Sequence, residues 1–335
     1  MTVLTSTTIA APAPTRISRR GVNVVVALRQ LLPAVIFLAV LGIVISLNPR
    51  VASYAGFTLM LSLAVPILLA TLAQMFVVTI GDIDLSIGPF VSLVACIGAT
   101  MLTSSPLYAV GLLLLAILAY AAAGALIELR RLPSIVVTLG LSFVWSGFAV
   151  LLLPTPGGVA PDWLRALMSY RPPFVPLPFV IAAVAGLLLH WFLMRSSVGV
   201  VLRGAGGSQL ALRRARWSIL GLRCALYSLS GLFGVFAGLA LLGLATSADA
   251  NMASRYTLLS IAGVILGGGE FTGGRISPIG AVFGALTLGL TSTMLTFMRI
   301  SPDWQIGAQG LILVAVLALR VSINAIGKNW EKSKK

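Results

Sequence analysis

Residues 107–127 read LYAVGLLLLAILAYAAAGALI, an apolar stretch without a single charged side chain. A helix rises 1.5 Å per residue, so about twenty residues span the ~30 Å hydrocarbon core of a bilayer. Similar stretches recur along the chain, in which 59% of residues are hydrophobic and 9% are charged. This composition excludes a disordered protein, a secreted disulfide scaffold and a periplasmic binding protein, and it predicts an all-α integral membrane protein.

Ten apolar windows are candidates for membrane spans, so we expect about ten transmembrane helices. The windows cover residues 31–47, 54–80, 88–103, 107–127, 134–153, 174–194, 219–246, 256–267, 278–298 and 304–322. The window at 256–267 is short, which leaves a re-entrant segment open as an alternative to a full crossing. Residues 31–322 are therefore expected to form one membrane domain.

The two ends of the chain are basic and are expected to lie outside the bilayer. Residues 1–30 carry four arginines and are predicted to be a disordered tail, and residues 323–335 form a second, lysine-rich tail. A signal peptide is the alternative for the N-terminus. The first apolar run, 31–47, is longer than the hydrophobic region of such a peptide, so we expect a first membrane helix that keeps its tail.

Basic residues are unevenly distributed between the two sides of the expected spans. With the N-terminus inside, the cytoplasmic side holds both tails, Arg130, Arg131, the 195–218 connection, Arg223, Arg275 and Arg320, whereas the outer side holds Arg50, Arg165, Arg171, Arg255 and Arg299. The positive-inside rule therefore predicts that both termini are cytoplasmic. Since no basic stretch is interleaved with aromatic residues, the net charge of +15 does not indicate nucleic-acid binding.

Two connections are long enough to contain structure of their own. The outer one, 154–173, includes Asp162–Tyr170, whose apolar residues predict a short helix on the membrane surface. The inner one, 195–218, includes Ser208 followed by Ala, Leu and Arg residues. Serine is a common helix N-cap, so a short, partly basic helix is expected there.

The chain lacks the residue combinations of a catalytic or metal site. His190 is the only histidine, and every lysine lies in the last eight residues, where no phosphate-binding loop is present. We therefore expect no enzyme, no catalytic residues, no metal site and no bound cofactor. Cys96 and Cys224 lie in apolar runs and are interpreted as small buried hydrophobic residues.

The eight acidic residues fall at span ends or between spans, so the middle of each expected helix lacks a carboxylate. Ion-coupled transporters usually carry an ionisable relay or an ion cage within the membrane. This distribution makes an ion-coupled secondary transporter the less favoured alternative.

Two glycine-rich junctions, Gly81–Gly88 and Gly267–Arg275, interrupt apolar stretches. They are typical of broken helices that expose backbone groups to a solute or a gate, although tight turns capped by Asp and Ser explain them as well. Their similarity hints at an internal repeat. Outside the window at 219–246, Asn251 is placed to hydrogen-bond a passing polyol, and loop capping is again the alternative.

The two junctions resemble motifs of the permease subunits of bacterial ATP-binding-cassette importers of the ribose, xylose and galactose type. Gly81–Gly88 is similar to the family's Gly-Gly-Ile-Asp-Leu-Ser-Val-Gly, with Asp82 in place of the second glycine and Ile87 in place of Val. Gly267–Arg275 resembles the family's Gly-Gly-x-x-x-x-Gly-Gly-Arg segment. The resemblance covers about residues 31–322.

The resemblance also extends to the inner loop. Residues 207–217 correspond to the family's Gly-Asn-x-x-Ala-Ala-x-x-Ser-Gly-Ile, in which Gly207 and Ala211 match. The family pattern is not kept at Ser208, Leu212, Ala215, Arg216 and Trp217. In such permeases this loop is a short helix that fits a groove of the ATPase. These differences from the family pattern leave open which ATPase the loop accepts and how well it couples to it. They are also compatible with a chain that pairs with a second, non-identical permease.

The resemblance implies a permease that imports a monosaccharide or similar polyol by alternating access across the bacterial inner membrane. It implies as partners two cytoplasmic ATPase subunits, which hydrolyse ATP with Mg, a periplasmic sugar-binding protein and a second permease copy, identical or not. A branched-chain amino-acid or nucleoside permease remains the alternative within the class. The residues expected at the ATPase contact are Gly207, Ser208, Gln209, Ala211, Arg213 and Arg214. Those expected at the pathway or gate are Asp84, Ser86, Gly88, Asn251, Gly268 and Gly273.

Overall fold

The computed structural model describes residues 19–301, with side chains from residue 31, and the separate positions 304, 307, 308, 310, 311, 314 and 318. The elements are α1 (Arg19–Leu47), η1 (Pro49–Val51), α2 (Tyr54–Ser62), α3 (Ala64–Thr79), α4 (Ile87–Met101), α5 (Pro106–Arg130), α6 (Ser134–Leu152), α7 (Asp162–Ser169), α8 (Leu177–His190), η2 (Trp191–Arg195), α9 (Ser197–Gly207), α10 (Gln209–Arg214), α11 (Ile219–Ala245), α12 (Tyr256–Leu266) and α13 (Pro278–Phe297). Within the described residues the only β contact is an isolated bridge between Gly157 and Ala248. The predicted all-α membrane fold is confirmed.

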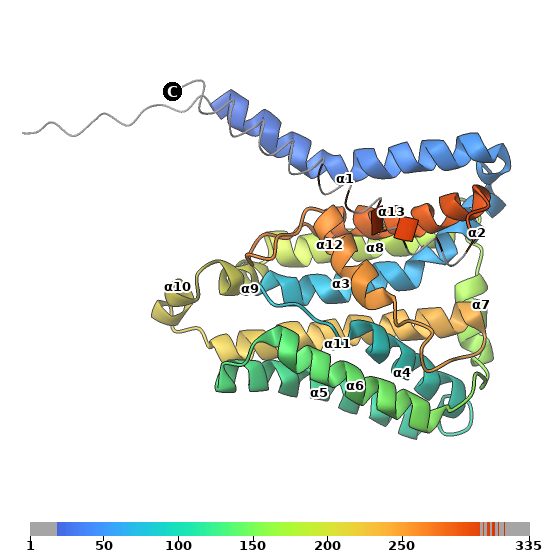
Figure 1. Cartoon of the computed structure of the whole chain (residues 1–335). Helices are drawn as coiled ribbons and strands as arrows, with labels where there is room; N and C mark the ends of the chain where they lie inside the picture. Colours follow the sequence, from blue (N-terminus) through green and yellow to red (C-terminus); the bar gives the residue numbers. More distant parts are fainter. Residues whose placement is uncertain are drawn as a thin grey trace, which may run out of the picture.

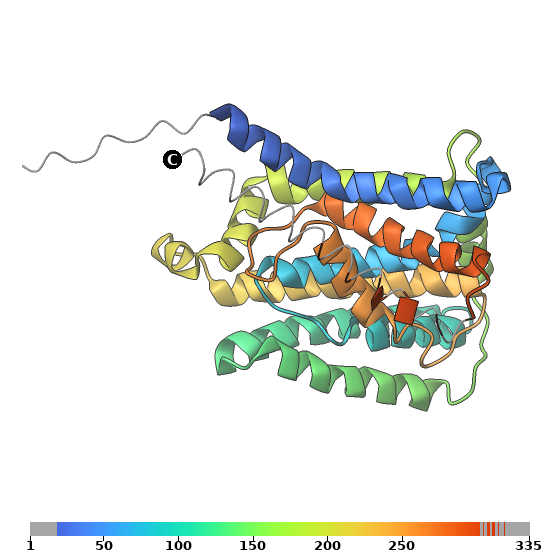
Figure 2. The ribbon, with the colours of Figure 1, turned by 45° about the horizontal axis from the view of Figure 1, so that its top comes forward.

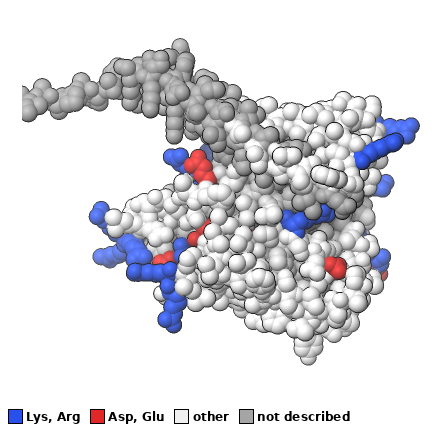
Figure 3. Space-filling view, viewed as in Figure 1, with Lys and Arg blue, Asp and Glu red and all other residues white. Residues whose placement is uncertain are grey.

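The long helices lie side by side around α11, which packs against α3, α4 and α5 (Figure 1). Helices α9 and α10 project at one end of the bundle, here called the α10 end, and α7 lies across the other, the α7 end. The view in Figure 2 shows the same two ends. The basic side chains on the face shown in Figure 3 gather mainly at the α10 end. The positive-inside rule therefore assigns the α10 end to the cytoplasm.

The expected number of ten membrane helices is not confirmed. Among the described residues, five helices are long and apolar enough to cross a bilayer, and α2 and α3, bent by 47° at their junction, form a sixth span if taken together. Helices α4 and α12 are too short for a complete crossing. The expected span at 304–322 lies outside the continuously described residues, as do most of the two predicted tails.

The first helix begins at Arg19 rather than at residue 31, so residues 19–30 are helical and do not belong to a disordered tail. The apolar window starts later because residues 19–30 contain three arginines, an Asn and a Gln. Hydropathy marks where a helix can enter hydrocarbon, whereas a helix can continue beyond that point through water or headgroups.

The two short helices expected in the connections are present. Helix α7 fills the place predicted for Asp162–Tyr170, and its Leu164 and Met168 pack onto Gly243 of α11, where a Cβ would lie 2.6 Å from Met168 Cγ. Ser208 caps α10 as expected, because its hydroxyl accepts a hydrogen bond from the Ala211 amide at 3.4 Å. The turn before it contains a second helix, α9, which was not predicted.

Two crossings consist of a non-helical segment followed by a short helix. After α3 ends at Thr79, residues 80–86 turn back into the bundle, where α4 begins and runs toward the α7 end. After α11 ends at Ala245, residues 246–255 turn back from the α7 end, where α12 begins and runs toward the α10 end. The short window at 256–267 therefore belongs to a full crossing, since α13 starts again at the α10 end.

The N-termini of α4 and α12 meet inside the bundle. The Gly88 amide donates to Thr257 Oγ1 at 3.1 Å, and the Ala253 amide donates to Ser92 Oγ at 3.0 Å. At Gly88 a Cβ would lie 2.6 Å from Thr257 Oγ1, so the close approach requires glycine. The two half-helices run in opposite directions, as in inverted repeats. By geometry, the counterpart of the 80–86 segment is the 246–255 segment, and not the 267–275 junction that the sequence suggested.

Candidate functional site

The carboxylate of Asp84 is fully buried, and side chains and backbone hold it from several directions. Its Oδ1 accepts hydrogen bonds from the Ser86 amide and the Ser86 hydroxyl, both at 2.7 Å, and its Oδ2 accepts one from Tyr120 at 2.9 Å. Gln74, in the amide orientation that pairs both of its ends, spans the Asp84 N–H and C=O at 3.1 Å each. A buried charge needs such partners, so this arrangement fixes the segment in one position.

The extended backbone next to Asp84 is paired by the first turns of α6. The Ile83 amide donates to Ser134 Oγ at 3.3 Å, and the Leu85 amide donates to Thr138 Oγ1 at 3.1 Å. The Thr138 hydroxyl in turn lies 3.2 Å from the Ile83 carbonyl. Irregular backbone is tolerated at membrane depth only where its polar groups find such partners. The polar backbone groups around Asp84 are therefore paired within the protein.

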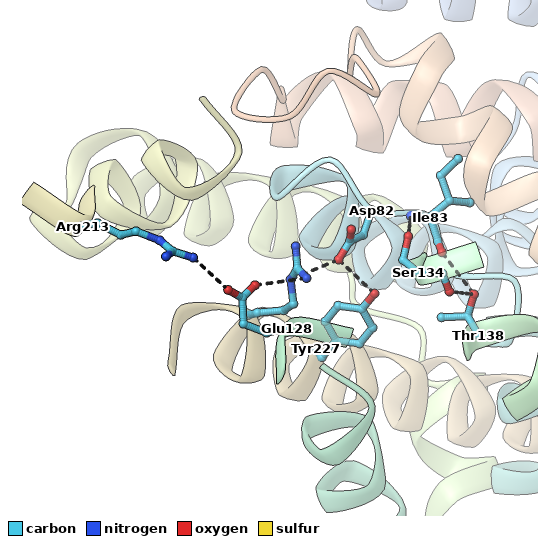
Figure 4. A network of polar contacts seen from close by, with 8 residues as sticks. Asp82, Ile83, Glu128, Ser134, Thr138, Arg213 and Tyr227 are labelled. Atoms are coloured by element: carbon cyan, nitrogen blue, oxygen red, sulfur yellow. Dashed lines mark hydrogen bonds and ion pairs between the residues drawn. The ribbon is translucent and has the colours of Figure 1, made fainter. Parts of the chain in front are cut away.

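A chain of charged side chains runs from this segment to α10 (Figure 4). Asp82 Oδ2 accepts a hydrogen bond from Tyr227 at 3.2 Å and lies 3.5 Å from Arg223 Nε. Arg223 Nη1 reaches Glu128 Oε2 at 3.2 Å, and Arg213 Nη2 reaches Glu128 Oε1 at 3.4 Å. The chain thus joins the break after α3, the start of α11, the end of α5 and the surface helix α10.

The second glycine-rich junction packs against the ends of α3 and α9. The Gly274 amide donates to the Thr79 carbonyl at 2.8 Å, and a Cβ on Gly206 would lie 2.1 Å from the same oxygen. Gly268, Gly273 and Gly274 have φ values of 102°, 78° and 72°, which disfavour other residues. The backbones of the junction, of the end of α3 and of the end of α9 therefore approach one another closely at the α10 end.

The 246–255 segment is more exposed than its counterpart. Asn251 and Ser254 are exposed. Local bonds run from the Asn251 amide to Asp249 Oδ1 at 2.8 Å and from Ser254 Oγ to the Asn251 carbonyl at 2.9 Å, while the Ala248 backbone pairs with that of Gly157. Polar irregular chain at this depth does not face lipid, so it faces water or another protein surface.

The residues expected at an ATPase contact lie together at the α10 end. Gly207 ends α9, Ser208 caps α10, and none of the six residues of α10 is buried. The helix is held to the bundle by Leu212 over Gly204 of α9 and by the Arg213–Glu128 pair. The expected pathway residues do not form one cluster. Asp84, Ser86 and Gly88 lie in the closed interior, Asn251 is exposed, and Gly268 and Gly273 lie at the α10 end.

Sequence reasoning missed Tyr120, Glu128, Arg223 and Tyr227 as members of the site. Arg223 was counted only as a cytoplasmic flanking charge, and Glu128 only as an acid at a span end. A signal was present, because Arg223 and Tyr227 are spaced i, i+4 and therefore share one face of an apolar helix. Their shared partner, Asp82, is 145 residues away from Tyr227 in the sequence, and no local pattern reveals such a distant contact.

Comparison with known proteins shows the family. Residues 56–317 match the family described as "Branched-chain amino acid transport system / permease component". The chain belongs to this permease family. Its location is therefore the cytoplasmic (inner) membrane of a bacterium, which it crosses several times, and the family works in general with ATPase and binding-protein partners.

Several curated proteins are similar to the permease over most of their length. The autoinducer 2 import system permease protein LsrD of an Enterobacter species is 29% identical over 81% of this chain and 86% of its own. The ribose import permease protein RbsC of Haemophilus influenzae is 26% identical over 72% and 78%, respectively. The galactofuranose transporter permease protein YtfT of Escherichia coli is 29% identical over 78% of each chain. No solved structure matches the permease.

Proposed function

We propose that this permease imports a monosaccharide or similar small polyol as the membrane subunit of an ATP-binding-cassette importer. The similarity to autoinducer 2, ribose and galactofuranose permeases carries the substrate class. The permease itself is not an enzyme and binds no cofactor. ATP is hydrolysed with Mg on a separate subunit, and transport proceeds by alternating access.

Helix α10 is the element through which the ATPase acts. None of its six residues is buried, it projects from the basic end of the bundle, and it carries Gln209, Arg213 and Arg214. A short amphipathic helix is suited to a groove on a partner, and a packed contact of this kind can follow a rigid-body movement of that partner.

The pathway forms between two permease copies, identical or not, and receives the solute from a periplasmic binding protein. The exposed polar segment 246–255 supports this arrangement, because its backbone needs a partner surface or a water-filled passage at membrane depth. Asn251 contacts the solute there. Asp84, Ser86 and Gly88 do not contact the solute but hold the half-helices in position. Gly268 and Gly273 shape the cytoplasmic gate.

A branched-chain amino acid is the second candidate substrate, because the family description names it. A nucleoside is the third, and an ion-coupled carrier is the alternative mechanism. Against the last, the buried carboxylate of Asp84 already accepts three hydrogen bonds, which is the arrangement of a structural anion and not of an ion cage.

Affinity purification of the tagged permease from its native membrane, with mass spectrometry and an ATPase assay, tests the proposal. We expect an ATPase and a binding protein to co-purify, and one member of a panel of sugars, branched-chain amino acids and nucleosides to stimulate hydrolysis. Stimulation by an amino acid or nucleoside alone would correct the substrate class. Uptake that is abolished by ionophores while ATP is supplied would contradict the mechanism.

A further inference from the structure

The ion-pair chain that begins at Asp82 is buried except at its α10 end. The side chains of Asp82, Arg223 and Glu128 are 12%, 11% and 16% exposed, whereas Arg213 is 59% exposed. Exposed ion pairs contribute at most about 1 kcal/mol, so Arg213 is the link that a partner protein can break most easily. A change at the surface can thus reach groups that are only partly accessible to solvent.

Arg223 is shared between two carboxylates and satisfies them unequally. Its Nη1 lies 3.2 Å from Glu128, whereas its Nε, 3.5 Å from Asp82, has no hydrogen-bond partner among the described atoms although it is buried. An orphaned buried donor is costly, so a small shift that completes a bond to Asp82 is favourable. The guanidinium consequently has two competing positions, one nearer Glu128 and one nearer Asp82.

Glu128 decides between these positions, because its two oxygens face two arginines. Oε1 accepts from Arg213 of α10, and Oε2 faces Arg223. When Arg213 leaves, Glu128 loses one of its two cations and attracts Arg223 more strongly. A cavity of about 430 Å³, lined by Asp82, Glu128, Gln209, Arg213 and Arg223 among others, gives these side chains room to move.

The carboxylate at position 82 is not required by the backbone. The residues with positive φ in the described chain include Gly81 but not Asp82, so residue 82 has no need of glycine or of a residue that tolerates the left-handed region. It is also one of the positions where the chain differs from the glycine of the family motif. A buried ion pair is weak evidence for stability, and its better-attested use is to specify one arrangement over another.

We propose that Arg223 is a two-position link through which α10 controls the 80–86 segment, with Asp82 and Glu128 as its alternative partners. Contact of α10 with Glu128 releases Arg223 toward Asp82 and holds the segment. Withdrawal of α10 draws Arg223 toward Glu128 and loosens it. That an ATPase moves α10 rests on the proposed function, whereas the link between Arg213 and the 80–86 segment concerns this chain alone.

Hydrogen exchange of the purified permease in lipid nanodiscs tests the link without ATPase or substrate. The readout is the exchange of peptides containing the amides of Ile83 and Leu85. We expect Arg213→Gln to speed their exchange by about threefold, in the range found for energetic coupling between connected sites. Arg214→Gln is the matched control, since Arg214 lies on the same exposed helix and has no ion pair among the described residues.

Combining Arg213→Gln with substitutions of Asp82 or Glu128 distinguishes a specific link from a general destabilisation of the 80–86 segment. In Asp82→Asn, and independently in Glu128→Gln, the Arg213→Gln effect should disappear, whereas Asp82→Glu, which keeps the charge, should retain it. An unchanged exchange rate in Arg213→Gln, an equal effect of Arg214→Gln, or an effect that persists in both neutral backgrounds would overturn the link. Failure to capture an ATPase would instead overturn the proposed function and leave the exchange result standing.

Discussion

The two broken crossings perform the same topological task with opposite surroundings. Residues 80–86 are enclosed by α5, α6 and α11, and their carboxylate, Asp84, is fully buried with three donors. Residues 246–255 combine bonds among themselves with bonds to the 157–160 segment and to Ser92 of α4, and Asp249 is partly exposed. This difference in burial supports the proposal that the first break is a fixed support and the second is the surface that meets a solute or a second copy.

Replacing the two aspartates is the strongest way to break this comparison. Asp84→Ala removes the buried acceptor of the Ser86 amide and of the Ser86 and Tyr120 hydroxyls, which keep only their contact with each other at 3.0 Å. We therefore expect a loss of about 3 kcal/mol or more. Asp249→Ala removes one bond at a partly exposed site and should cost about 1 kcal/mol or less. Thermal unfolding in nanodiscs measures both. Equal losses would contradict the assignment of a fixed and an open break.

The next largest destabilisation is expected from disrupting the contact between the half-helices α4 and α12. In Gly88→Ala the new methyl group would meet the Ala253 carbonyl at 2.7 Å, and backbone atoms cannot move aside as a flexible side chain can. We expect a loss of about 1–3 kcal/mol and of transport. Gly140→Ala on α6, where no atom lies within 4 Å of the added Cβ, is the control and should preserve both.

A smaller effect is expected from Tyr120→Phe, which removes one hydroxyl and keeps the ring. The ring centroid lies 4.6 Å from that of Phe90 and 6.2 Å from that of Trp145, on which it is stacked, so this packing is kept. The hydroxyl contacts with Asp84 at 2.9 Å and with Ser86 Oγ at 3.0 Å are lost. The expected destabilisation is about 1–2 kcal/mol, clearly below that of Asp84→Ala. A larger loss in Tyr120→Phe than in Asp84→Ala would show that the hydroxyl, and not the carboxylate, organises the segment.

The sequence predicted the complete helices well and the broken ones poorly. Runs such as 107–127 and 134–153 became α5 and α6 within a few residues, because an apolar run bounded by Pro, Ser or Arg has one way to cross a bilayer. Hydropathy does not distinguish irregular chain from helix, so the windows at 54–80 and 256–267 gave no indication of the bend after Ser62 or of the turns before Tyr256.

The candidate site was predictable only where its signals are local. Glycines with positive φ and the cap of α10 follow from a few adjacent residues. The partners of the buried acids do not, because Tyr120 is 36 residues from Asp84 and Tyr227 is 145 residues from Asp82. Asp84 does lie between two helices, as expected, but its complete burial was not predicted, because a residue between two apolar runs is still buried when the chain turns back into the bundle.

The smallest energetic effect, and the most direct test of what the open break faces, is expected at Asn251. Its side chain is exposed, so Asn251→Ala should change stability by no more than about 0.5 kcal/mol while it weakens uptake of the solute. Accessibility separates the two breaks further. With Cys96 and Cys224 replaced, a membrane-impermeant thiol reagent added from outside should label Asn251→Cys and react ~10-fold or more slowly with Ser86→Cys, since a fully buried thiol is shielded from the reagent. Equal labelling would mean that the passage also reaches the first break. Absence of labelling at position 251 would mean that the exposed segment is covered by protein, and the solute path would then have to lie elsewhere in the pair.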